Sequence, residues 1–188
     1  MIVNDKALAK VLKRSGTAGF KLCVNGTTMR LVGWGWAARA TLSDDPPKLV
    51  LSTLVEMLGY IPADGDCGHI YKVKDGWEWQ DLTEAVFDAE YAGVSCRNGT
   101  SSSCVLLPIR YGGLPLIMTR SRAIYSVSGP GMLAVNGSSM MLREPSALCF
   151  GDRESEIYIE CRRPEVPGRI WTQLEQIEWE ACEDAETN

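Results

Sequence analysis

The stretch from residue 47 to residue 62 has the clearest pattern of hydrophobic and polar positions in the chain. Its apolar residues recur at the 3.6-residue period of one helix face: Leu51, Leu54, Val55 and Leu58, widened by Val50 and Met57. Asp44, Asp45 and the prolines favour a helix start here, and Gly59 with Pro62 favours its end. We therefore expect a helix whose apolar face is covered by a sheet or by another helix.

The residues before this helix predict a first helix and then short strands. Asn4 is a suitable cap for a helix over residues 4–15, and Gly16 is suited to ending it. Residues 19–24 and 27–32 predict two strands, joined by Asn25-Gly26 in a type I′ turn. Residues 37–42 predict a third strand. Trp34 and Trp36, beside glycines, indicate a bend where the indoles fold onto a neighbour, such as the helix at 47–62.

After this helix, residues 61–68 predict a loop, and residues 69–74 and 77–80 predict a hairpin around Asp75-Gly76. Residues 81–91 favour a helix that begins with a capping box of Asp81 and Glu84. The polar residues 98–103 predict an exposed, mobile loop. Further strands are predicted at 104–110, 114–119, 123–128, 132–135, 138–143 and 156–161, followed by an acidic helix at 170–181.

These elements predict an α+β fold with an antiparallel, hairpin-rich sheet or small barrel packed by about three to four helices. Residues 1–93 form the N-terminal part and residues 94–188 the β-rich C-terminal part of one compact domain. A hydrophobic content of 45% is enough for a core. No apolar run is long enough for a membrane span, and no secretion signal is evident. We therefore expect a cytoplasmic protein whose seven cysteines are mainly free thiols.

Charge is distributed unevenly along the chain. Residues 1–40 carry seven basic side chains and one acidic one, whereas residues 171–188 carry six acidic side chains and no basic one. The candidate nucleic-acid contacts are Lys6, Lys10, Lys13, Arg14, Arg30 and Arg39. The candidate contacts to a basic protein partner are Glu175, Glu178, Glu180 and Glu183. The alternative is that both ends are ordinary solvated surface. Likewise, Trp34 and Trp36 are candidates for stacking on unpaired bases or for packing in the core.

The sole histidine, His69, lies two residues after Cys67 and supplies the weak candidates for catalysis. Residues two apart on a strand share a face, so a Cys–His nucleophilic pair is one hypothesis. A zinc site that adds Cys96 and Cys104 is another, although the spacings do not match known zinc modules. The sequence has no phosphate-binding glycine loop. We therefore expect no cofactor or metal, and favour a non-enzymatic protein.

Three segments carry a resemblance to a known class: NDKALAKVLKR, GWGWAARA and KLVLSTLVEMLGYIP. They resemble small accessory proteins of phages and mobile elements in gut Firmicutes, some of which are anti-CRISPR inhibitors. The resemblance covers about the first third of the chain. It implies a host nuclease or another nucleic-acid-binding complex as partner, with DNA contact through the basic N-terminal region. A small cytosolic Cys/His enzyme and a sequence-independent nucleic-acid binder are the alternatives. The oligomeric state stays open.

Overall fold

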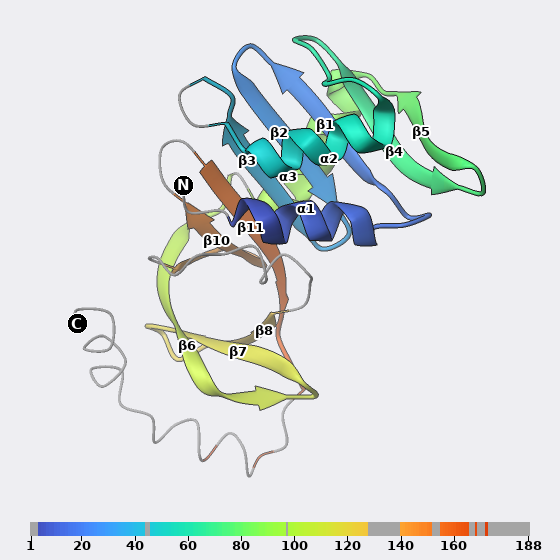
Figure 1. Ribbon diagram of the computed structural model, residues 1–188. Helices are drawn as coiled ribbons and strands as arrows, with labels where there is room; N and C mark the ends of the chain where they lie inside the picture. The colour runs from blue at the N-terminus through green and yellow to red at the C-terminus, as the bar shows by residue number, and fades with distance from the viewer. Residues whose placement is uncertain are drawn as a thin grey trace.

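The computed structural model describes residues 4–43, 46–96, 98–127, 140–151 and 155–165, together with Gly168 and Thr172 (Figure 1). The helices in these ranges are α1 (Asp5–Arg14), α2 (Lys48–Leu58) and α3 (Glu84–Ser95). The N-terminal strands are β1 (Phe20–Asn25), β2 (Thr28–Gly33), β3 (Trp36–Thr41), β4 (Cys67–Val73) and β5 (Gly76–Asp81). The later strands are β6 (Ser101–Tyr111), β7 (Leu114–Thr119), β8 (Ile124–Val127), β9 (Met140–Arg143), β10 (Ala147–Gly151) and β11 (Ser155–Arg162).

The strands of the described residues form one antiparallel sheet in the order β10-β9-β6-β7-β8-β11-β3-β2-β1-β4-β5. Because β10 also pairs with β11, the strands β11, β10, β9, β6, β7 and β8 close into a ring. Figure 1 shows this ring as a small barrel below an open sheet. The long strand β11 belongs to both, since its first residues pair with β3 and its last with β8.

The predicted fold class is therefore wrong. The expected α+β fold had three to four helices packing the strands, but the described residues contain eleven strands and three short helices. A sheet of this size covers much of its own apolar surface when part of it curls into a barrel. The apolar side chains that meet in this part of the core are Leu142, Leu148, Phe150, Ile157, Ile159 and Cys161. None of the described helices is long and apolar enough to cross a membrane.

The helices cover both faces of the open sheet. On one face, α1 and α2 bury Leu8, Leu12, Val50 and Leu54 against the strands. On the other face, α3 buries Phe87 and Tyr91. The N-terminal end of α1 lies beside the N-terminal end of α2, because Asp5 accepts hydrogen bonds from the N–H groups of Leu49 (2.7 Å) and Val50 (2.8 Å). Helix α2 has no side-chain cap of its own, so Asp5 of α1 caps it from outside.

Helix α2 exists as predicted, and its predicted apolar face is confirmed except at Val55. The buried residues are Val50, Thr53, Leu54 and Met57, whereas Val55 is 41% exposed. Leu51 and Leu58 are partly buried. Leu49 and Val55 are apolar but exposed, so apolar residues lie on more than one side of α2. Contact with α1 and β5 selects the stripe that faces inward. Asp44 and Asp45 lie outside the described residues.

Helix α1 and both predicted hairpins are confirmed, with changes at their turns and caps. Asn4 caps α1 as expected, accepting from the Ala7 N–H at 3.1 Å. In the first hairpin Asn25 pairs with Thr28, so Gly26 and Thr27 form the turn. Gly26 has a φ of +57° and Thr27 has no positive φ, which excludes the predicted type I′ turn. The cap of α3 is Thr83 instead of Asp81.

The β-rich part differs from the prediction at two places, and the tryptophans of the bend before β3 differ as well. Residues 101–103 were expected in a mobile loop but begin β6 and pair with β9. Strand β10 was not predicted. The tryptophans of the bend separate: Trp36 is buried, with its indole against Gly33, whereas Trp34 is 81% exposed. The predicted strand at 132–135 and all but Thr172 of the predicted helix at 170–181 lie outside the described residues.

Candidate functional site

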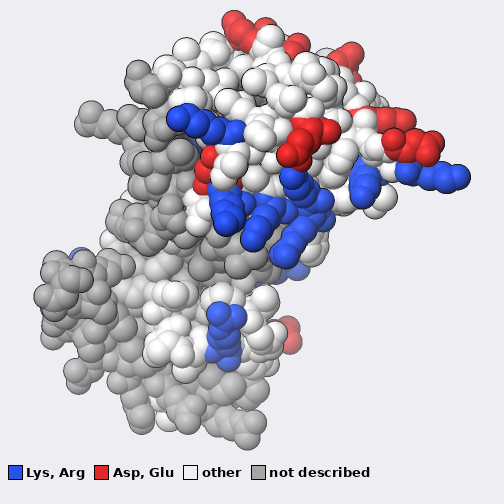
Figure 2. Space-filling view, viewed as in Figure 1, with Lys and Arg blue, Asp and Glu red and all other residues white. Residues whose placement is uncertain are grey.

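The exposed side of α1 gathers four of the predicted basic residues. Burial of Leu8, Val11 and Leu12 turns the rest of the helix toward solvent. The exposed cations are Lys6, Lys10, Lys13 and Arg14. From Lys6 to Arg14 the helix rises about 12 Å. Figure 2 shows a group of basic side chains over α1. Lys13 forms an ion pair with Glu56 of α2 at 2.5 Å, with both side chains at least half exposed.

Strand β4 adds a fifth cation that the sequence analysis missed. The N–H of Lys72 donates to the carbonyl oxygen of Gly16 at 3.0 Å, which places the end of β4 beside the turn after α1. Lys72 is exposed, and it shares a strand face with Ile70, which is buried in the core with α1 and α2. We call the residues Lys6, Lys10, Lys13, Arg14 and Lys72 the α1 basic face. Lys72 lies 58 residues after Arg14, so no local pattern links them.

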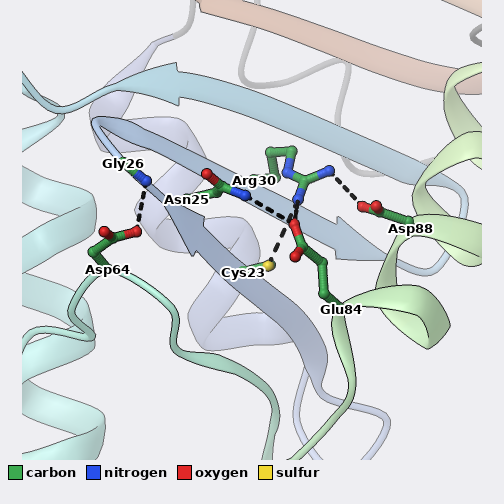
Figure 3. A network of polar contacts seen from close by, with 7 residues as sticks. All are labelled: Cys23, Asn25, Gly26, Arg30, Asp64, Glu84 and Asp88. Atoms are coloured by element: carbon green, nitrogen blue, oxygen red, sulfur yellow. Dashed lines mark hydrogen bonds and ion pairs between the residues drawn. The ribbon is translucent and has the colours of Figure 1, made fainter.

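The structure places the other two predicted cations on the opposite side of the sheet. Arg30 and Arg39 are cross-strand partners on β2 and β3, and both lie on the α3 side. Figure 3 shows the Arg30 guanidinium between two carboxylates of α3. It lies 3.1 Å from Glu84 and 2.5 Å from Asp88. The six predicted residues therefore do not form one surface. Side chains on β2 and β3 alternate between the two faces of the sheet. The basic stripe of α1 does not indicate which face Arg30 and Arg39 take.

Arg30 also packs against the aromatic rings of α3. Its guanidinium carbon lies 5.2 Å from the ring centre of Phe87 and 5.7 Å from that of Tyr91. Burial opposes the charged form of this side chain, but the hydrogen bond and the charge of Asp88 outweigh it, so the pKa of Arg30 is raised above its ordinary value. Arg30 thus fastens α3 to the sheet by ion pairs and cation–π contacts.

A polar cavity of about 560 Å³ lies beside α3, and we call it the α3-side cavity. Its lining residues are Asn25, Thr28, Arg30, Arg39, Glu84, Tyr91, Arg143, Glu156 and Tyr158. Glu156 is held from two sides, by Arg39 Nε at 3.1 Å and by the Tyr158 hydroxyl, which donates at 2.7 Å. The cavity therefore joins residues from five strands and from α3 that no sequence motif connects.

Two residues that line this cavity, Arg143 and Tyr91, carry donor groups outside the ion pairs described for it. Arg143 lies with its guanidinium carbon 5.1 Å from the ring centre of Tyr158. Among the described residues, no carboxylate lies within ion-pairing distance of Arg143. The hydroxyl of Tyr91 is buried and has no hydrogen-bond partner among the described residues. Burial, followed by the nearby charge of Glu156, raises the pKa of Tyr91, so this hydroxyl stays protonated at neutral pH.

Cys67 and His69 do not form the geometry of a catalytic pair. Cys67 is buried and opposite Cys23, its partner on β1. Burial, together with the Cys23 hydrogen bond, raises the pKa of the Cys67 thiol to about 12, which disfavours a nucleophilic thiolate. His69 Nε2 lies 3.1 Å from the carbonyl oxygen of Ala18, to which it donates. Across the described ranges, no group of three or more His, Cys, Asp or Glu is arranged to hold a metal, including Cys96 and Cys104.

Trp34, a predicted base-stacking residue, is separated from the α1 basic face. Trp34 lines a second cavity, of about 580 Å³, together with Lys21 and Glu90, which form an ion pair. Glu90 belongs to α3, so this indole does not extend the surface made by α1. The acidic residues predicted to bind a protein partner lie outside the described residues: Glu175, Glu178, Glu180 and Glu183.

Comparison with known proteins gives no assignment for either surface. No protein-family model matches the chain, and no curated protein matches it. A crystal structure of a DNA polymerase III subunit beta, the DnaN sliding clamp of Bartonella birtlesii, is similar with 7% sequence identity and a TM-score of 0.30. The match covers 95% of this chain and 66% of the clamp chain. A likeness at this level carries no argument, so the functional conclusion rests on the residues of this chain.

Proposed function

We propose that the protein is a non-enzymatic binding protein that contacts nucleic acid through the α1 basic face. The observation that carries this proposal is the exposure of five cations on one side of the molecule. Among the described residues, Lys13 is the member of this face that forms an ion pair. The other charges are therefore available to a polyanion.

The support for this face is rigid. Helix α1 is capped by Asn4, its apolar side is buried, and Asp5 joins it to α2. The cations are thus displayed by a packed helix, which reduces the ordering that binding requires. The rise of about 12 Å from Lys6 to Arg14 corresponds to three or four nucleotides of one strand in B-form DNA. Contacts to phosphates would be independent of sequence and would release counterions.

The experiment is a salt titration of binding to a labelled DNA duplex and to a labelled single strand, read by fluorescence anisotropy. The variant K6Q/K10Q removes two charges from the α1 basic face. A matched control, R110Q/R162Q, removes two exposed charges from barrel strands β6 and β11. We expect the first variant to bind more weakly and to lower the slope of log K against log salt by about 2.

The control should bind as the parent protein does. Absence of binding at low salt, or an unchanged salt slope in K6Q/K10Q, would refute the proposal.

We further propose a specific partner for the α1 basic face. The resemblance to anti-CRISPR inhibitors implies a host nuclease complex. We propose to test it by affinity capture from a bacterial lysate with and without nuclease treatment. Recovery of one large nuclease by the parent protein, and its loss in K6Q/K10Q, would support docking on a nucleoprotein. Recovery of a metabolic enzyme complex would contradict it.

A further inference from the structure

We propose that the α3-side cavity is a binding site for a small molecule with a carboxylate or phosphate group, held by Arg143 and by the hydroxyl of Tyr91. This site lies on the side of the open sheet opposite to α1. It is therefore independent of the nucleic-acid contact proposed above.

One cation at the cavity has no carboxylate partner among the described residues. Three arginines line it, Arg30, Arg39 and Arg143, together with two carboxylates, Glu84 and Glu156. Arg30 is engaged by Glu84 and by Asp88, which lies next to the cavity, and Arg39 is engaged by Glu156. Arg143 is the lining arginine for which no described carboxylate lies within ion-pairing distance. The oxyanion of a ligand would supply this partner.

The position of Arg143 suits recognition of an oxyanion. Its guanidinium carbon lies over the Tyr158 ring, 5.1 Å from the ring centre. A guanidinium carries five N–H donors in a fork that matches a pair of carboxylate or phosphate oxygens. The Tyr158 ring fixes the direction of the side chain, which lowers the entropy lost when a ligand binds.

Tyr91 supplies the second, independent observation. Tyr91 lines the cavity and is 95% buried, since 5% of its surface is exposed, and its hydroxyl is buried without a hydrogen-bond partner. A buried hydroxyl without a hydrogen bond is unfavourable, and such groups are rare in folded proteins. A ligand oxygen in the cavity would accept a hydrogen bond from it.

Both carboxylates that line the cavity are paired with an arginine. Glu156 accepts from Tyr158 and pairs with Arg39, and Glu84 accepts from Asn25 at 2.9 Å and pairs with Arg30. The Arg143 guanidinium and the Tyr91 hydroxyl are donors, which suits an anion. A cavity of about 560 Å³ has the size of a small-molecule site.

The test uses the full chain and two probes, inorganic phosphate and benzoate, in isothermal titration calorimetry. Saturable binding of phosphate would assign a phosphoryl ligand, and saturable binding of benzoate a carboxylate ligand. We expect R143Q to lower the affinity for the probe that binds by about tenfold or more. We expect Y91F, which removes one hydrogen bond, to weaken it by about fivefold. The matched control R162Q changes an exposed arginine on β11 and should bind like the parent.

Each outcome decides the proposal. Failure of both probes to bind at concentrations up to about 10 mM would overturn it. Equal binding by the parent, R143Q and Y91F would also overturn it, because the probe would then lie elsewhere. Circular dichroism of both variants separates lost binding from lost folding. K6Q/K10Q should keep its affinity for the probe, so this proposal can fail or hold without affecting the nucleic-acid proposal.

Discussion

Replacing Arg30 with methionine tests whether this one side chain fastens α3 to the sheet. Methionine keeps an unbranched apolar stem of similar length, so most of the packing over Phe87 and Tyr91 remains while the charge is lost. The Arg30 side chain is 13% exposed, but its partners Glu84 and Asp88 are about half exposed, at 51% and 48%. After the loss of Arg30 both carboxylates would therefore still be hydrated, and no buried charge would be left without a partner.

The expected cost follows from these exposures. Each ion pair with a half-exposed carboxylate contributes about 0.5 kcal/mol. The cation–π contacts at 5.2 and 5.7 Å contribute about 1 kcal/mol more. We therefore expect R30M to lower the free energy of unfolding by about 2 kcal/mol. R30K keeps the charge but loses the fork that reaches both carboxylates, and should lose about 1 kcal/mol.

The assay is urea unfolding at neutral pH, with amide hydrogen exchange to locate the change. The matched control is K13M, which removes the exposed ion pair with Glu56 and should cost about 0.5 kcal/mol or less. Exchange in R30M should accelerate most in α3. If R30M and K13M differ by less than about 0.5 kcal/mol, or if exchange in α3 is unchanged, the assigned role of Arg30 is wrong.

Substitutions at three other positions give further tests by urea unfolding. Y91F removes a buried hydroxyl without a partner and should raise the free energy of unfolding by about 1 kcal/mol; a loss would show that this hydroxyl is satisfied. D5A removes the cap of α2 and should cost 1 to 2 kcal/mol, roughly, whereas D5N should cost less, because its amide oxygen still accepts; equal costs would contradict capping. Burial raises the pKa of Cys161 from 9.0 to about 12, so its contribution to stability is present below pH 9 and is lost as the pH rises toward 12. Stability of the parent should fall above pH 9 by about 1.4 kcal/mol per pH unit more steeply than that of C161A, and parallel curves would refute this.

The local signals of the sequence predicted local structure well. A good N-cap, a narrow apolar stripe and a glycine after it marked α1, and the alternating strands beside Asn25-Gly26 marked the first hairpin. These signals act between residues close in the chain, so they depend little on what the rest of the protein does. The same reasoning was sufficient to find Lys6, Lys10, Lys13 and Arg14 on one side of a helix.

The same signals failed where the choice depended on a distant neighbour. The helical period of α2 predicted a buried Val55, but α1 and β5 contact other positions of the helix and leave Val55 exposed. Strand β10 stands between β9 and β11, and its pairing on both edges gives it an order that its short sequence did not predict. The sheet-dominated fold class was missed for this reason, because barrel closure is a property of pairings between strands far apart in the chain.

The α1 basic face and the α3-side cavity also differ in how much of each the sequence determines. The sequence alone determined that α1 carries a row of basic residues, because helical spacing fixes where neighbouring side chains lie. Only the tertiary structure decided that Lys72 joins this row, that Arg30 and Arg39 face α3, and that Arg143 and Tyr91 meet at one cavity. The physical reason is that strand pairing joins residues that are far apart in the sequence. No spacing within a single segment records which distant strand will be its partner.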